Sequence, residues 1–263
     1  MIFHQPHNSQ TNHSHNAHFY TDEIWDYHFH KNPEIIYVLE GAVDCTVNEN
    51  NYTLKKGEFG LCLSYDRHSY KPLKNTHYWV IVFSEDYIRY FVKQTSGKTG
   101  NGFKFNCSKS VKDFVVYELI NNKKPSELII KSCLYAVCEQ YIKSVELIDD
   151  KIKSKETVAL IVDYIFKNHT KNLKLADIAK NLGYDYNYMS RNFKKLFKMT
   201  FTEFLNIYRL ETAVRLLDET DYNISRIAFE SGFQSVRAFN DFFKKQMKTS
   251  PSQYKKQVKA FEK

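Results

Sequence analysis

The sequence has no long apolar run, and its five cysteines form no CxxC pair. A helix that spans a bilayer needs about 20 mostly apolar residues, and the opening MIFHQPHNSQ lacks the basic and apolar regions of a secretory signal. An odd number of cysteines without paired spacing favours reduced thiols over a disulfide framework. We therefore expect a soluble protein of the cytoplasm.

The signatures of several enzyme classes are also missing. The chain shows no glycine-rich phosphate loop, no Ser/His/Asp order typical of hydrolases, and no zinc ribbon. We therefore expect no catalytic residues, no cofactor and no enzymatic activity.

Positive charge is concentrated in one half of the chain. The net charge is +8, with −2 over residues 1–150 and +10 over residues 151–263. A basic half behind a nearly neutral half indicates an anionic partner for the C-terminal part only. Charge alone does not distinguish DNA from RNA or from an acidic membrane.

Residues 24–84 have the pattern of a β domain. Short segments rich in β-branched and aromatic residues are separated by the turn formers Gly57, Asn50-Asn51 and Pro72. Without intervening helices, this pattern favours an antiparallel sandwich or barrel. The polar, histidine-rich residues 1–19 are expected to form a flexible arm.

Helical periodicity begins after Ser108. Within residues 127–147, apolar side chains recur every three or four positions, and Ile129, Cys133 and Ile142 widen this stripe. The helix could pack on its own β domain and on a second subunit, which would make the protein a homodimer, or it could be buried within one chain. The polar stretch 149–156 is the predicted boundary between domains 20–150 and 151–263.

An internal repeat occupies the C-terminal domain. Three blocks in residues 178–204 recur 49 or 50 positions later, in the same order. The first copies are Ile178-Ala179 with Gly183-Tyr184, Phe193-Lys194-Lys195, and Thr200 to Phe204. The second copies are Ile227-Ala228 with Gly232-Phe233, Phe243-Lys244-Lys245, and Ser250 to Tyr254.

Each copy has the pattern of a helix-turn-helix unit. A first helix ends at Gly183 or Gly232, and a second helix begins after the predicted caps Asp185 or Ser235. One face of the second helix is apolar, with Met189 and Phe193, or Phe239 and Phe243. The other face carries side chains that can contact bases or phosphates: Asn187, Ser190, Arg191, Lys194 and Lys195 in the first unit, and Arg237, Asn240, Asp241, Lys244 and Lys245 in the second.

A single amphipathic helix over residues 201–220 is predicted to join the two units. Capping boxes run from Thr200 to Glu203 and from Ser250 to Gln253, so each helix start is encoded locally. A rigid connector would fix the distance between the second helices. For two successive major grooves on one face of DNA, that distance is about 34 Å.

The run from Leu175 to Lys256 resembles the DNA-binding domain of the AraC/XylS family from end to end. The resemblance implies a regulator of transcription, usually an activator that works with RNA polymerase. Its base-reading positions fall on Asn187, Ser190 and Arg191, and on Arg237 and Asp241. Lys198 and Lys248 stand where the family usually has glycine, which predicts a strained turn or a longer helix.

The front of the chain resembles the cupin-type sensor domain of such regulators, through His28-Phe29-His30, Pro33 to Gly41, Gly57-Glu58 and His68. This implies a small-molecule effector inside the barrel, with a sugar as one candidate, and dimerisation through the helices that follow. The candidate ligand-binding residues are Trp25, His28, His30, Glu34, Tyr37 and His68. The predicted fold class is α+β in two domains: an antiparallel cupin-like β-barrel with trailing helices, then an all-α domain of two helix-turn-helix units.

His28, His30, Glu34 and His68 also match the spacing of metal-binding cupin enzymes. The alternative function is therefore a metal-dependent isomerase or dioxygenase fused to a DNA-binding domain. Regulators of the family often keep these side chains as hydrogen-bonding groups, so we expect no metal. The sequence leaves the effector and the operator open.

Overall fold

The computed structural model describes residues 3–4, 15–149, 154–197 and 199–261. It divides into two compact units, Met1–Glu156 and Thr157–Lys263, a few residues beyond the predicted boundary. Among the described residues, no helix is long and apolar enough to cross a membrane.

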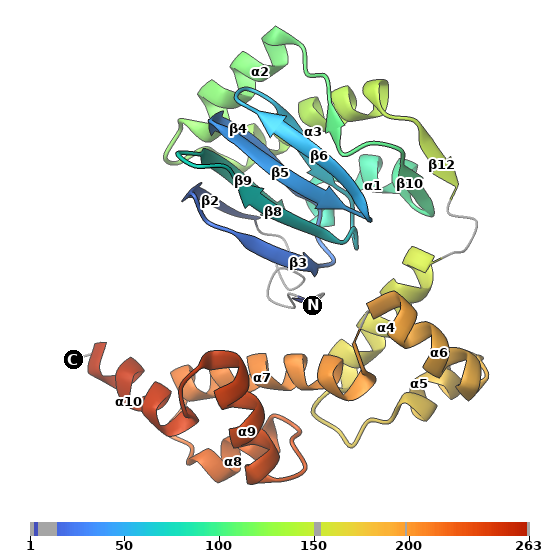
Figure 1. Cartoon of the computed structure of the whole chain (residues 1–263), viewed down its shortest axis with the longest axis vertical. Coiled ribbons are helices and arrows are strands. Elements are labelled where there is room, and N and C mark those ends of the chain that lie inside the picture. The colour runs from blue at the N-terminus through green and yellow to red at the C-terminus, as the bar shows by residue number, and fades with distance from the viewer. Residues whose placement is uncertain (1–2, 5–14, 150–153, 198, 262–263) are drawn as a thin grey trace. The chain divides into compact units, whose positions relative to one another are not determined.

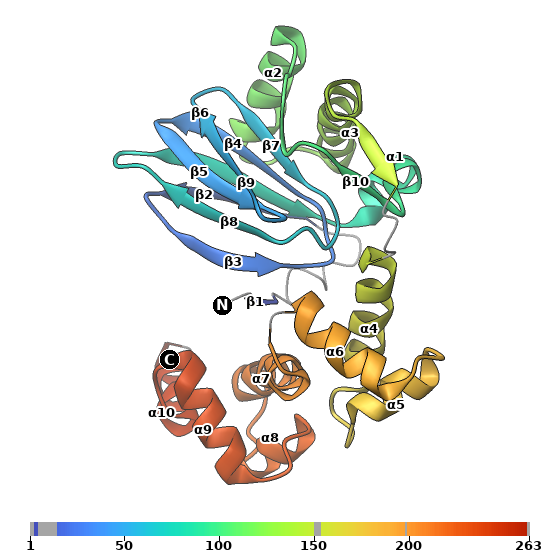
Figure 2. The same cartoon turned by 45° about the vertical axis from the view of Figure 1, so that its right-hand side comes forward.

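The N-terminal unit contains two five-stranded sheets (Figures 1 and 2). The order of the first sheet is β1 (Phe3–His4), β3 (Trp25–Phe29), β8 (His68–Pro72), β5 (Ala42–Val47) and β6 (Asn50–Lys55). That of the second is β11 (Lys104–Phe105), β7 (Phe59–Cys62), β4 (Glu34–Glu40), β9 (His77–Phe83) and β2 (His15–Thr21). All neighbours are antiparallel except β1 and β3. The predicted antiparallel β domain is confirmed, as two sheets rather than one continuous barrel.

The side chains of β4 alternate between two hydrophobic cores, one on each face of the second sheet. Ile36 and Val38 belong to a core shared with the first sheet, whereas Ile35 and Tyr37 belong to a core shared with helices. Successive strand side chains point to opposite faces, so a strand covered on both sides is apolar throughout. The central strand of this sheet therefore lies between two hydrophobic layers.

Helices cover the outer face of the second sheet (Figure 1). They are the 3₁₀ turn η2 (Glu85–Ile88), α1 (Arg89–Thr95), α2 (Lys109–Val115), the π-helical turn η3 (Val116–Ile120) and α3 (Glu127–Ser144). The strands β10 (Lys98–Gly100) and β12 (Leu147–Asp149) lie before α2 and after α3 in the chain and pair as a separate two-stranded antiparallel sheet. In α3, Cys133 is buried, and Ile129 and Ile142 pack against the same core. The widened stripe thus packs within its own chain.

Two local predictions are wrong. Residues 15–19 of the predicted arm belong to β2, which pairs with β9 from His15 to Thr21. The predicted turn at Asn50-Asn51 lies inside β6, and the hairpin turns instead at Asn48 and Glu49, whose φ angles are 48° and 74°. The backbone of both residues adopts the left-handed conformation that a two-residue hairpin turn requires.

The C-terminal unit is entirely helical, as predicted. Its helices are α4 (Ser154–Asn168), α5 (Leu175–Asn181), α6 (Tyr186–Phe197), α7 (Phe201–Glu219), α8 (Ile224–Glu230), α9 (Val236–Met247) and α10 (Pro251–Phe261). The connecting helix α7 packs Phe204 against Phe193 and Phe197 of α6, with ring centroids 5.6 and 4.5 Å apart. At its other end, Ala213 and Leu217 join the core of α8 and α9. One helix thus contributes to both cores.

Candidate functional site

The first helix-turn-helix unit consists of α5, a glycine turn and α6. Gly183 has φ +72°, and the Tyr184 amide donates to the Ala179 carbonyl at 2.8 Å. The Asp185 carboxylate accepts hydrogen bonds from the amides of Asn187 and Tyr188 at 2.9 and 3.1 Å. These bonds satisfy donors that the first turn of a helix leaves unpaired. The predicted cap is confirmed.

The second unit, α8, its turn and α9, has the same geometry. Gly232 has φ +92°, the Phe233 amide donates to the Ala228 carbonyl at 3.0 Å, and the Ser235 hydroxyl accepts from the Ala238 amide at 3.1 Å. At the end of α9, Lys248 has φ 59°, which is the strained turn that the sequence predicted. The corresponding Lys198 lies outside the described residues.

The second helix of each unit buries one face and exposes the other. Met189 and Phe193 of α6, and Phe239 and Phe243 of α9, are buried as predicted. The ten polar side chains predicted to contact DNA are all exposed: Asn187, Ser190, Arg191, Lys194, Lys195, Arg237, Asn240, Asp241, Lys244 and Lys245. Each helix therefore offers a free polar face anchored by an aromatic core.

The two exposed faces differ in charge. Arg237 lies 3.9 Å from Asp241 one turn later, so part of its charge is already balanced. Within the described part of the chain, Arg191 forms no ion pair, and its Nε donates to the carbonyl of Asn187 at 3.2 Å. The cationic character of α6 is therefore less compensated than that of α9.

Arg209 is a structural residue that the sequence reasoning missed. Its guanidinium is buried on α7 and donates to the carbonyls of His169 and Lys171 at 2.9 and 3.0 Å. Its burial lowers the pKa of the guanidinium. A lone arginine between Tyr208 and Leu210, within the apolar stripe of a predicted helix, was the available signal. It ties the connecting helix to the segment between α4 and α5.

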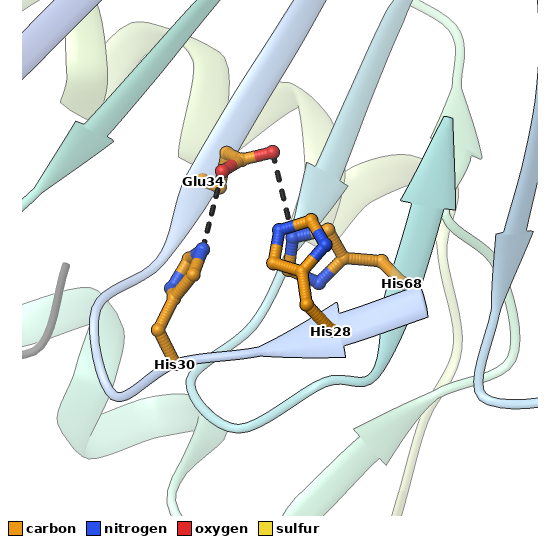
Figure 3. Close-up of side chains that lie close together, drawn as sticks. All are labelled: His28, His30, Glu34 and His68. Carbon is orange, nitrogen blue, oxygen red and sulfur yellow. Dashed lines mark hydrogen bonds and ion pairs between the residues drawn. The ribbon is translucent and has the colours of Figure 1, made fainter. Parts of the chain in front are cut away.

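In the N-terminal unit, His28, His30, Glu34 and His68 converge inside the sandwich (Figure 3). His28 comes from β3, His30 from the following loop, Glu34 from the start of β4, and His68 from β8. All four are buried, and their candidate ligand atoms lie within 4.8 Å of one another. His30 Nε2 is 3.2 Å from Glu34 Oε2, and His68 Nε2 is 3.5 Å from Glu34 Oε1.

Of the other two candidate ligand-binding residues, Trp25 borders this cluster and Tyr37 lies apart from it. The Trp25 ring centroid is 6.1 Å from that of His28, so Trp25 borders the group. Tyr37 lies on the opposite face of β4, where its ring packs 4.5 Å from that of Phe59. Alternation along the strand separates Tyr37 from Glu34.

Burial and mutual charge set the protonation of the cluster. Desolvation lowers the pKa of His28 well below its usual value and also lowers that of His30. Burial likewise opposes charge on Glu34 and His68, but neighbouring groups outweigh it. His68 and His30 hold the pKa of Glu34 well below its usual value, and Cys62 and Glu34 hold that of His68 well above. Burial thus favours the neutral forms of His28 and His30, whereas Glu34 is favoured as a carboxylate.

A separate hollow of about 550 Å³ lies on the helical side of the second sheet. It is lined by His15 and Phe19 of β2, Trp79 of β9, and the segment from Leu119 to Pro125. Its volume is within the range of small-molecule pockets. The sequence alone did not indicate this hollow, because the segment 15–19, which lines one side of it, was predicted to belong to a flexible arm.

These features define a two-domain protein in which a β-sandwich of ligand-binding type precedes a tandem helix-turn-helix domain of DNA-binding type. Residues 14–136 match the model of the AraC-like ligand binding domain, and residues 178–257 match a helix-turn-helix domain model. The chain belongs to the AraC family of transcriptional regulators.

Individual relatives are similar to parts of the chain. The transcriptional regulatory protein HptR of Staphylococcus aureus is 33% identical over 99 residues, which are 38% of this chain and 39% of HptR. An uncharacterized HTH-type transcriptional regulator of S. aureus strain MSSA476 is 27% identical over 129 residues, 49% of this chain and 17% of that protein. The matches thus span well under half the length of either relative.

The two-domain fold is that of ToxT from Vibrio cholerae. The TM-score to its structure is 0.58 at 21% identity, with 92% of this chain and 98% of ToxT covered. At this identity the likeness concerns the fold. The fold class predicted from the sequence is therefore confirmed.

Proposed function

We propose that this protein is a ligand-responsive transcription regulator that reads two successive major grooves with α6 and α9. The exposed polar faces of these two helices, each held by a buried aromatic core, carry the proposal. The net charge of +10 over residues 151–263 favours a polyanionic partner. Since α7 is shared by both cores, it would hold the two helices at a fixed spacing.

The N-terminal domain, in this proposal, controls DNA binding by the C-terminal domain. A small molecule bound by the N-terminal domain would set DNA affinity. The family resemblance supports an activator that contacts RNA polymerase in the cytoplasm. ToxT, which shares the fold, has been solved with an unsaturated fatty acid bound. That supports a small-molecule effector here, whether sugar, fatty acid or another ligand.

The first unit is expected to dominate sequence recognition, with Arg191 as its main base contact. Arginine pairs bidentately with guanine, which is worth about 1–3 kcal/mol of discrimination at one position. Arg237 is less available because Asp241 lies beside it. We expect Arg191→Ala to remove the preference at one base of a site selected from random DNA by the full-length protein.

Lys195→Ala is the matched control, since Lys195 is exposed on the same helix and is expected to contact phosphate. It should weaken binding to all sequences alike and reduce the slope of affinity against salt by about one. An unchanged motif with uniformly weaker binding by Arg191→Ala would show that Arg191 contacts only phosphate. Failure of the wild-type protein to select any motif would refute the proposed function.

We also propose that the protein forms a homodimer through α3. Leu128 is 77% exposed at the start of α3. Tyr90 and Tyr135 are also exposed, and the Tyr90 backbone amide donates a hydrogen bond to the Tyr135 hydroxyl at 3.4 Å. We expect Leu128→Arg to shift sedimentation of the full chain from dimer to monomer. Leu73→Arg changes an exposed leucine of the sheet region and should leave the dimer intact. Sedimentation of the wild type as a monomer would refute the dimer and leave DNA binding untouched.

A further inference from the structure

The three buried histidines of the sandwich share one hydrogen-bonding arrangement. The Nδ1 atoms of His28, His30 and His68 lie 2.7, 2.7 and 2.9 Å from backbone carbonyl oxygens. The acceptors are the carbonyls of Asp26, Asn32 and Asp66, each two residues away from its histidine. A carbonyl only accepts hydrogen bonds, so each Nδ1 must carry the proton. In each neutral ring the Nε2 atom therefore has no proton and carries a lone pair that can accept a hydrogen bond or bind a metal ion.

These lone pairs face a carboxylate. Glu34 is fixed by the Tyr70 hydroxyl, which donates to Oε1 at 2.6 Å, and its oxygens lie 3.2 and 3.5 Å from the Nε2 atoms of His30 and His68. A lone pair does not bind a carboxylate oxygen without a positive charge between them. The buried His68 Nε2 has no hydrogen-bond partner. A single proton can bridge one such contact. Because three imidazole nitrogens and a carboxylate converge here, one proton does not satisfy all of them.

We propose that His28, His30, Glu34 and His68 bind one divalent transition-metal ion. Imidazole nitrogens with a carboxylate oxygen are ligands preferred by zinc and by iron, nickel and cobalt. Around a tetrahedral zinc with bonds of about 2.0–2.1 Å, neighbouring ligand atoms lie roughly 3.4 Å apart. The distances from His30 Nε2 to Glu34 Oε2 and from His68 Nε2 to Glu34 Oε1 are each close to this value. They end on different oxygens, so the carboxylate has to turn one oxygen to the ion, and the wider pairs of ligand atoms have to move inward from separations of up to 4.8 Å.

The surrounding bonds are those that a metal site needs. A ligating histidine almost always donates its other ring N–H to a carbonyl or carboxylate, which fixes the ring and raises its basicity. All three histidines do so here, and the Tyr70 hydroxyl orients the carboxylate. The spacing of the four residues matched a metal site, but the resemblance to regulators that keep these side chains as hydrogen-bonding groups led us to expect no metal. The spacing also does not show which ring nitrogen faces the centre.

The ion would connect the two sheets. His28 on β3 and His68 on β8 belong to the first sheet, and Glu34 on β4 belongs to the second. All four ligands are buried, which fits an ion that stabilises the sandwich or is itself sensed. This inference does not depend on DNA binding.

The test is metal analysis of the full-length protein after stripping with a chelator. Titration with zinc, and separately with cobalt and nickel, should give one ion per chain by plasma mass spectrometry, a higher Tm, and a visible cobalt spectrum. His68→Gln removes one imidazole ligand, so the affinity of the protein for the metal ion should fall on the order of 100-fold or more. Glu34→Gln, a change of similar size, should also weaken binding, and it keeps the test valid if His68→Gln does not fold.

His18→Ala is the matched control, since His18 is exposed on β2 of the same unit. It should leave stoichiometry, affinity and the cobalt spectrum unchanged. Replacement of His4, His7 and His13 by alanine should likewise leave the single tight ion in place. Absence of stoichiometric binding by the folded wild type would overturn the proposal, as would binding that survives both His68→Gln and Glu34→Gln.

Discussion

Gly232→Ala should lower the free energy of unfolding of the helical unit by about 3 kcal/mol. At φ +92° an alanine is strained, and its Cβ would lie 2.6 Å from the His169 carbonyl oxygen and 2.7 Å from Thr170 Cα. These contacts are with backbone, so the turn between α8 and α9 would have to move away from the segment before α5. Chemical denaturation followed by far-UV circular dichroism measures the loss.

Gly183→Ala is the control that separates conformation from contact. Gly183 has φ +72°, but a Cβ there would meet nothing within 4 Å. Its replacement should cost only about 1 kcal/mol, the cost of a left-handed alanine. Both tryptophans, Trp25 and Trp79, lie in the N-terminal unit, so fluorescence should report an unchanged transition for both variants. Equal losses in the two variants would show that the close approach at Gly232 is unimportant.

Arg209→Met should destabilise the same unit by about 3 kcal/mol. The substitution keeps most of the apolar side chain but leaves the carbonyls of His169 and Lys171 without their donors. A buried carbonyl that loses its partner costs about 1–3 kcal/mol, and a charged donor makes the lost bond stronger. The prediction is a lower denaturation midpoint by circular dichroism, with weaker DNA binding because α7 would lose its hydrogen bonds to the segment before α5.

Arg215→Met tests whether any arginine of α7 would have this effect. Arg215 is exposed and, among the described residues, pairs only with Glu219 one turn away. A surface pair of this kind is worth at most about 0.5 kcal/mol, so the midpoint should hardly move. A comparable loss in Arg215→Met would assign the effect to general charge on the helix rather than to the bonds with the carbonyls of His169 and Lys171.

Gly232 and Arg209 act on one segment. The His169 carbonyl accepts from Arg209 and lies against the position where Gly232 lacks a Cβ. The segment that joins α4 to α5 therefore contacts both the connecting helix and the turn of the second unit. We expect the double variant to lose less than the sum of the single losses, because neighbouring changes that release the same segment are not additive.

The sequence by itself determined the features that depend on neighbouring residues. The caps Asp185 and Ser235 and the left-handed turns at Gly183 and Gly232 follow from side chains and backbone freedom within a few positions. The repeat and the apolar stripes of α6 and α9 likewise depend only on spacing. For the same reason, the two helix-turn-helix units and their exposed faces were predictable.

Only the tertiary structure decided the features that depend on distant partners. Residues 15–19 of β2 were predicted to be part of a polar arm because only the pairing with β9 makes them a strand. The place of Arg209 in an apolar stripe likewise does not show that its partners are two carbonyls about 40 positions earlier in the chain. Spacing placed His28 and His30 with Glu34, but it could not show that each Nδ1 is held by a carbonyl. That orientation depends on the path of the loops at the sheet edge, and it turns the remaining nitrogens toward one point.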